Sequence, residues 1–152
     1  MLKFVNTDVV FQEIPDEVTL AINLAGCPCH CPGCHSPYLW ADEGTPLTTS
    51  AIDNMIAHNR NITCVALMGG DAEPSMVEQL ARHIRSTHPG LKAAWYSGRT
   101  ILPPSINHRN FDYIKIGPYL KHLGPLRSKL TNQRLYRISG GKMHDITSRF
   151  WK

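Results

Sequence analysis

Four of the five cysteines of this chain lie close together. Cys27, Cys29, Cys31 and Cys34 fall within eight residues, whereas Cys64 stands alone in an apolar run. Disulfides between residues so close in sequence would close almost no loop and would add little stability. In a chain that is not secreted, such a cluster is typical of metal binding or redox chemistry. A lone cysteine such as Cys64 is expected to be a small buried hydrophobe.

The spacing Cys27-x-x-x-Cys31-x-x-Cys34 supplies three thiolates on one short loop. An iron-sulfur cluster of the electron-transfer type takes four cysteines, and structural zinc takes four Cys or His ligands. Three ligands leave one metal with an open position, where a substrate can bind directly. This spacing favours a catalytic [4Fe-4S] cluster, with Cys29 as a bystander.

The alternative from the same residues is a structural zinc site. Cys29, His30 or His35 would then complete the ligand set, because Cys and His at short spacings are typical of zinc. The other histidines show no ligand spacing among themselves and are expected at the surface; they are His58, His83, His88, His108, His122 and His144.

Strand and helix patterns alternate along the chain. Serine followed three residues later by an acidic residue, as in Ser50 with Asp53 and Ser75 with Glu78, predicts the starts of two helices. The β-rich runs predict strands over 8–14, 17–24, 62–68, 91–96, 112–116 and 134–138. The alternation from residue 17 to residue 116 predicts βαβ units, a mostly parallel sheet and a single domain over 1–152.

Three segments are expected to meet at one edge of this sheet. The cysteine loop follows the strand over 17–24, Gly69-Gly70-Asp71 follows the central strand over 62–68, and Ser97-Gly98-Arg99 follows the next strand along the chain. Ligands of open α/β sheets bind outside the carboxyl ends of the strands. The sequence therefore predicts one active site that combines the three segments.

Composition excludes several classes of protein. The chain has 152 residues, of which 42% are hydrophobic and 18% charged, and its formal charge is +4. This mild charge is spread along the chain, which argues against nucleic-acid binding. No apolar run reaches the roughly 20 residues of a membrane span, and residues 1–25 lack the pattern of a secretory leader. A cytoplasmic location is expected.

The stretch from Asn23 to Trp40, NLAGCPCHCPGCHSPYLW, resembles the signature of the radical S-adenosylmethionine enzymes. Together with Met68-Gly-Gly-Asp71, Trp95-Tyr-Ser-Gly98 and Thr131-Asn-Gln-Arg134, it resembles the activating proteins of anaerobic (class III) ribonucleoside-triphosphate reductases. The resemblance spans roughly residues 17 to 138.

This resemblance implies a radical-generating activase. A [4Fe-4S] cluster on Cys27, Cys31 and Cys34 would bind S-adenosylmethionine and cleave it reductively, and the product radical would create a glycyl radical on the reductase. A flavodoxin-like protein would be the electron donor. Alternatives are the activation of another glycyl-radical enzyme, a small-molecule radical S-adenosylmethionine enzyme, or a zinc-binding interaction module without catalysis.

The resemblance also implies cofactor contacts. Gly33, Cys34 and His35 match positions that pass along the adenine. Gly69 and Gly70 would let the backbone approach the methionyl part of the cofactor.

Asp71 would accept a hydrogen bond from the amino group of the cofactor, and Ser97 would bond its ribose or carboxylate. The chain has Ile116-Gly117-Pro118 where many relatives have Asp-Gly-Lys, which removes two polar contacts. Lys115 would replace them only in a different strand register and is not counted as a site residue.

The length limits the fold. A full (β/α)8 barrel takes about 250 residues, so the expected architecture is α/β, an incomplete, open (β/α) barrel of radical S-adenosylmethionine type. A wide mouth would admit a loop of a large partner protein.

Overall fold

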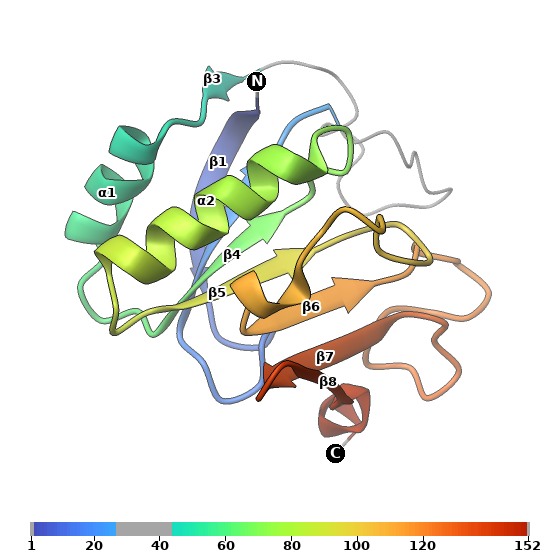
Figure 1. Ribbon diagram of the computed structural model, residues 1–152. Coiled ribbons are helices and arrows are strands. Elements are labelled where there is room, and N and C mark those ends of the chain that lie inside the picture. Colours follow the sequence, from blue (N-terminus) through green and yellow to red (C-terminus); the bar gives the residue numbers. More distant parts are fainter. Residues whose placement is uncertain (1, 27–43, 152) are drawn as a thin grey trace.

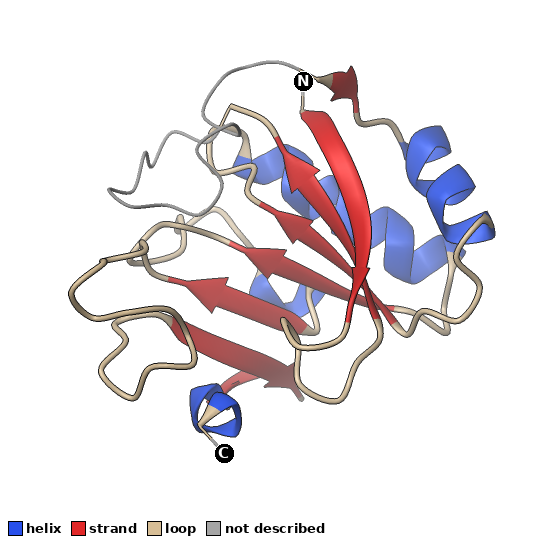
Figure 2. Cartoon of the chain, turned by 180° about the vertical axis from the view of Figure 1, so that it is seen from behind, coloured by secondary structure: helices blue, strands red, loops and turns tan. Residues whose placement is uncertain are grey.

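A computed structural model of the chain describes residues 2–26 and 44–151. Eight strands form one open sheet in the order β3-β1-β2-β4-β5-β6-β7-β8. Both described α-helices cover the same face of this sheet (Figure 1), and the view from behind shows the strands in front of them (Figure 2). The elements are β1 (Lys3–Val10), β2 (Thr19–Leu24), β3 (Thr45–Pro46), α1 (Thr49–Ala57), β4 (Cys64–Met68), α2 (Pro74–Thr87), β5 (Lys92–Tyr96), η2 (His108–Asn110), β6 (Tyr113–Ile116), β7 (Arg134–Ser139), β8 (Lys142–Asp145) and η3 (Thr147–Phe150).

The sheet is mixed, which corrects the expectation of a mostly parallel one. The central pairings β2-β4, β4-β5 and β5-β6 are parallel. The four outer pairings, β3-β1, β1-β2, β6-β7 and β7-β8, are antiparallel. Short connections explain most of this difference, because a tight turn can only join antiparallel strands. Asp16, with a φ of 68°, lies in the turn before β2, and Gly140-Gly141 joins β7 to β8.

The prediction of an open sheet is confirmed, since the sheet does not close and β3 and β8 are its edges. The βαβ pattern holds in part. Helices α1 and α2 lie between β2, β4 and β5 in the chain, but the described connection from β5 to β6 contains only the short η2. The radical S-adenosylmethionine barrel itself stays a prediction.

Each central strand is buried on both faces, which explains the nearly continuous apolar runs in the sequence. One face packs against the helices, and its core includes Leu67 of β4, Trp95 of β5 and Ile114 of β6. α2 contributes an apolar stripe with helical spacing, consisting of Val77, Leu80, Ala81 and Ile84. The opposite face carries a second, smaller core of Ile14, Cys64, Ala66, Ala94, Tyr113 and Leu135.

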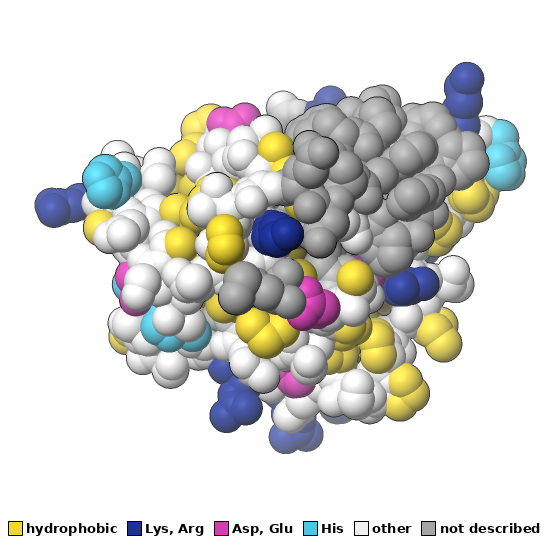
Figure 3. All heavy atoms as spheres, turned by 90° about the horizontal axis from the view of Figure 1, so that it is seen from above, with side chains coloured by type: hydrophobic (Ala, Val, Ile, Leu, Met, Phe, Trp, Pro, Cys, Tyr) yellow, Lys and Arg dark blue, Asp and Glu magenta, His cyan; other side chains and the backbone are white. Residues whose placement is uncertain are grey.

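No helix in the described parts of the chain is long and apolar enough to cross a membrane. Lys and Arg side chains lie at separate places over the coloured part of the face in Figure 3 rather than in one patch. This distribution agrees with the dispersed charge of the sequence.

Candidate functional site

The cysteine motif lies outside the described residues. This applies to Cys27, Cys29, Cys31 and Cys34 and equally to Gly33 and His35, so their assignments stay predictions. The structure does describe the strand that leads into the motif. β2 ends at Leu24, and Ala25 donates its backbone N–H to the carbonyl of Lys3 at 2.9 Å. The end of β2 is thereby held against β1.

The carboxyl ends of the four parallel strands lie level with one another. Asn23 of β2 pairs with Met68, Met68 pairs with Tyr96, and Tyr96 pairs with Lys115. The segments that follow β4 and β5 therefore leave the sheet at the same edge at which β2 enters the cysteine motif. We call this edge the carboxyl edge.

Asp71 and Ser97 meet at this edge. The Ser97 hydroxyl donates to Asp71 Oδ1 at 2.5 Å, and the backbone N–H of Gly98 donates to Oδ2 at 2.9 Å. Both side chains are buried, with Asp71 4% and Ser97 0% exposed. Ser97 Oγ also accepts a hydrogen bond from the N–H of Arg99 at 3.1 Å. The structure thus brings together two predicted cofactor-binding residues and makes Ser97 a support for the Asp71 carboxylate.

Gly69 and Gly70 form the turn that delivers Asp71. Their φ angles are 113° and 84°, which side chains with a Cβ rarely adopt. A Cβ on Gly70 would come within 2.6 Å of Val77 Cγ2. Gly69 accepts a hydrogen bond from Trp95 Nε1 at 2.6 Å through its carbonyl. The fold therefore requires both glycines independently of any cofactor.

Lys115 is a charged residue of this edge that the sequence reasoning set aside. It is 8% exposed, and its Nζ donates to the carbonyl of Gly117 at 3.2 Å and lies 5.3 Å from the centre of the Tyr96 ring. It shares its face of the sheet with Tyr113 and Tyr96, away from the helices. The strand alternation of Ile114, Lys115 and Ile116 was the available signal, because it places the lysine on the face opposite the two isoleucines.

The Thr131-Asn-Gln-Arg134 segment also reaches the carboxyl edge. Asn132 Nδ2 donates to the carbonyl of Pro118 at 3.0 Å, while its buried Oδ1 has no hydrogen-bond partner among the described residues. Gly117 packs so closely against this segment that a Cβ there would lie 3.0 Å from Gln133 Cα. Buried polar atoms are nearly always hydrogen-bonded, so Asn132 Oδ1 is an available acceptor at this edge.

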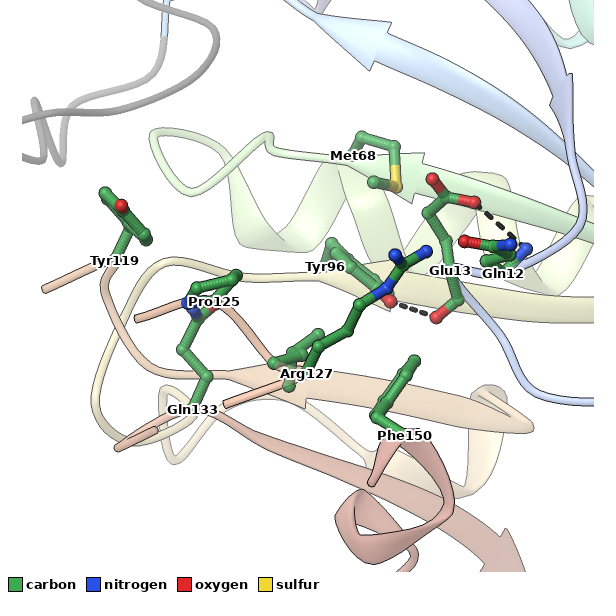
Figure 4. A pocket seen from close by; sticks show the side chains of 10 residues that line it. Gln12, Glu13, Met68, Tyr96, Tyr119, Pro125, Arg127, Gln133 and Phe150 are labelled. Carbon is green, nitrogen blue, oxygen red and sulfur yellow. Dashed lines mark hydrogen bonds between the residues drawn. The ribbon is translucent and has the colours of Figure 1, made fainter. Parts of the chain in front are cut away.

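A pocket of about 520 Å³ opens on the face of the sheet opposite the helices (Figure 4). Its lining includes Met68 and Tyr96, the last residues of β4 and β5, together with Arg127, Gln133 and Phe150. The Tyr96 hydroxyl donates to a backbone carbonyl of the segment after β1, which closes one side of the pocket. Burial, reinforced by nearby acidic groups, raises the pKa of Tyr96, so this hydroxyl stays protonated.

The opposite, amino edge of the sheet carries a buried carboxylate. Glu17 accepts hydrogen bonds from Lys92 Nζ at 2.6 Å, Thr63 Oγ1 at 2.7 Å and the Tyr113 hydroxyl at 2.7 Å. Burial raises the pKa of Glu17, but the hydrogen bonds from Lys92, Thr63 and Tyr113 outweigh burial and leave it below its usual value. Because these residues precede or begin four neighbouring strands, the cluster ties the sheet together far from the carboxyl edge.

The described structure tests two further predictions, on Cys64 and on the histidines. Cys64 is fully buried, and burial raises the pKa of its thiol, as expected for a small hydrophobe. The expectation that the remaining histidines are unrelated is wrong for His83 and His88. Both rings contact Asp53 Oδ1, because the chain turns at the end of α2 and the two helices pack side by side.

Comparison with known proteins identifies an iron-sulfur protein. The family model described as a 4Fe-4S single cluster domain matches residues 18–114, which is more than half of the chain. The chain therefore belongs to the 4Fe-4S single cluster domain family. This match spans the cysteine motif, both helices and the parallel strands up to the start of β6, and it fits a protein of radical S-adenosylmethionine type. No curated protein and no solved structure matches the chain.

Proposed function

We propose that the protein is a cytoplasmic radical S-adenosylmethionine activase that generates a glycyl radical on an anaerobic ribonucleoside-triphosphate reductase. One observation carries this proposal. The buried Asp71 carboxylate, fixed by Ser97 and Gly98, lies at the sheet edge where β2 enters the three-cysteine motif. A fixed acceptor at this edge suits a cofactor that carries an amino group, whereas electron transfer alone does not require one.

The residues of the carboxyl edge fit the methionyl part of S-adenosylmethionine. Its amino group is a hydrogen-bond donor and its carboxylate an acceptor. Asp71 is the acceptor for the amino group, and Lys115 is the cation for the carboxylate. Ser97 links the two residues, because its hydroxyl binds Asp71 while its backbone N–H donates to the Lys115 carbonyl at 2.8 Å. Asn132 Oδ1 is a further acceptor, for a ribose hydroxyl.

The cluster would be held by Cys27, Cys31 and Cys34, and their three thiolates suit a [4Fe-4S] cluster with one open iron. A cluster held there would pass one electron from the flavodoxin-like donor to S-adenosylmethionine for its reductive cleavage, and the adenosyl product would take a hydrogen atom from a glycine of the reductase. The chain itself binds and orients. Asp71 holds the amino group, and Ser97 keeps that carboxylate in place.

The reductase would dock at the carboxyl edge. Ile101 follows β5 and is 74% exposed, and Leu130 precedes β7 and is 72% exposed. Since β7 runs antiparallel to β6, it begins at this edge, and the two side chains present apolar surface there. The neighbouring pocket of Met68 and Tyr96 would admit the glycine-bearing loop, while the partner excludes solvent.

The deciding experiment is anaerobic reconstitution with iron and sulfide, followed by incubation with S-adenosylmethionine, a reduced flavodoxin-like donor and the reductase. We expect about four irons per chain, formation of 5'-deoxyadenosine and methionine, and a glycyl-radical signal on the reductase. Cys31→Ala should lose the cluster, whereas the matched Cys29→Ala should keep it. Tightly bound zinc in a colourless protein would support an interaction module instead.

Two further outcomes separate the finer claims. Cofactor cleavage without a radical on the reductase would support the activation of another glycyl-radical enzyme or chemistry on a small molecule. Loss of S-adenosylmethionine binding in Lys115→Met, with the iron retained, is expected if Lys115 binds the cofactor carboxylate. Unchanged affinity would remove Lys115 from the site.

A further inference from the structure

We propose that Asp53, His83 and His88 form a second metal site, separate from the cysteine motif, that binds one divalent transition metal of the zinc class. Asp53 belongs to α1, His83 to α2, and His88 directly follows α2. All three side chains are partly exposed. Because the site lies at the carboxyl-terminal end of α2, it is remote from the edge where the cofactor is proposed to bind.

The ligand atoms already lie close together. Asp53 Oδ1 is 2.9 Å from His83 Nε2 and 2.8 Å from His88 Nε2, and the three ligand atoms all lie within 4.8 Å of one another. A tetrahedral zinc ion with bonds of about 2.0–2.1 Å holds its ligand atoms about 3.3 Å apart. Small side-chain rotations therefore suffice to admit the ion. Two imidazoles and one carboxylate are ligands that suit zinc and its neighbours in the first transition row.

The fold builds this arrangement from residues that are far apart in sequence. On a continuous helix, His83 and His88 would point about 140° apart, because successive residues turn by about 100°. His88 leaves the helix, with φ −125° and ψ 72°, while its N–H still caps the carbonyl of Ile84. Its ring thereby returns beside that of His83. On α1, burial of Ile52 in the core turns the adjacent Asp53 toward the edge of α2.

The second nitrogen of His83 also has a partner. His83 Nδ1 lies 3.4 Å from Thr87 Oγ1, one helical turn further along α2. When a metal occupies Nε2, the ring proton is on Nδ1, and the Thr87 hydroxyl oxygen can accept a hydrogen bond from this N–H. Such an outer partner fixes the orientation and tautomer of a ligating histidine.

The surroundings leave room for a fourth ligand. A cavity of about 530 Å³ adjoins the site and is lined by Asp53, Thr87 and His88. Arg60 lines the same cavity, and its charge opposes a cation. We therefore expect binding weaker than at a structural zinc site, with water as the fourth ligand.

A titration with Co²⁺ tests the site on the complete protein with its iron-sulfur cluster assembled. We expect one saturable Co²⁺ per chain, with the visible absorption of a nitrogen- and oxygen-ligated ion and without the thiolate charge-transfer bands that cysteine ligands would produce. Zn²⁺ should displace it. Asp53→Asn and His83→Gln should each weaken binding at least about tenfold, whereas His144→Gln, which removes an exposed histidine of β8, should leave it unchanged.

A second measurement avoids substitutions altogether. In the unsubstituted protein, Zn²⁺ should shift the side-chain nitrogen signals of two of the eight histidines together in an NMR titration. Absence of saturable Co²⁺ binding would overturn the proposal, as would equal binding by the Asp53 and His83 variants. The cluster would then be a metal-free clasp, in which two histidines donate to one carboxylate and join α1 to α2.

Discussion

Replacing Ser97 with alanine tests the support of the Asp71 carboxylate. The substitution removes one hydroxyl from a side chain that is fully buried and nearly isosteric with alanine. Asp71 Oδ1 loses the 2.5 Å hydrogen bond, while the Gly98 N–H bond to Oδ2 remains. The Arg99 N–H also loses its acceptor, but Arg99 is exposed, so water can replace that bond.

The size of the expected loss of stability follows from the burial of Asp71 and Ser97. A hydrogen bond to a charged group contributes about 1.5–3 kcal/mol, and a buried group that loses its partner is not rescued by water. Because Asp71 is 4% exposed, we expect the free energy of unfolding to fall by about 2–3 kcal/mol. A carboxylate that is less well fixed should also bind S-adenosylmethionine about tenfold more weakly, which corresponds to about 1.4 kcal/mol.

Anaerobic urea unfolding, followed by circular dichroism at matched iron content, measures the first effect, and equilibrium dialysis of S-adenosylmethionine measures the second. Ser50→Ala, at an exposed serine of α1, is the control and should change neither quantity. Asp71→Asn should weaken cofactor binding further, by about 10- to 100-fold. If Ser97→Ala leaves both stability and affinity unchanged, the Ser97 hydroxyl does not hold the Asp71 carboxylate in place.

Three further predictions concern stability and docking. The pKa of Glu17 is lowered in the folded state, so ionised Glu17 stabilises the fold above pH 4.5, its ordinary pKa. This stabilisation is lost as the pH falls through the pKa of the folded state. Between about pH 7 and about pH 3, the urea midpoint should therefore fall more steeply for the unsubstituted protein than for Glu17→Gln. Trp95→Phe removes the hydrogen bond to the Gly69 carbonyl, and urea unfolding should show a loss of about 1–3 kcal/mol. The double substitution Ile101→Lys and Leu130→Lys should weaken reductase binding in calorimetry at least about tenfold, with iron content and cofactor affinity unchanged; equal binding would place the partner elsewhere.

The sequence predicted the central strands well because their signal is local. A strand buried on both faces must be almost wholly apolar, and 62–68 and 91–96 contain the observed β4 and β5. The capping motifs were less reliable. Thr48, rather than Ser50, caps α1, and α2 starts at Pro74 without a side-chain cap, while Glu78 binds Asn107 and Asn110 instead.

Strand direction and the short outer strands depend on tertiary contacts. β3 and β8 span two and four residues, too few to show a period, and they form only because β1 and β7 offer free edges. The orientation of β7 depends on a connection whose path no local pattern encodes. These elements change a mostly parallel prediction into a mixed sheet.

Site residues that directly follow strands could be predicted from the sequence, whereas residues placed by strand register or helix packing were missed. Asp71 and Ser97 come together because they follow neighbouring parallel strands, which the alternation of elements implied. Strand alternation indicates the face on which Lys115 lies, but its level at the carboxyl edge required the register of β5 against β6. His83 and His88 required the turn after α2, which no periodic pattern reveals.

The buried charged groups at the two edges of the sheet have different roles. A fixed carboxylate and a buried cation at the carboxyl edge cost stability unless partners compensate them. At the amino edge, Glu17 accepts three hydrogen bonds from groups at the starts of neighbouring strands, and these bonds hold the parallel core in register. Since the same four strands connect the two edges, the register set by Glu17 also sets the level at which Asp71 and Lys115 emerge. Loss of the Glu17 hydrogen bonds should therefore weaken cofactor binding, although Glu17 itself lies at the opposite edge of the sheet from the proposed cofactor site.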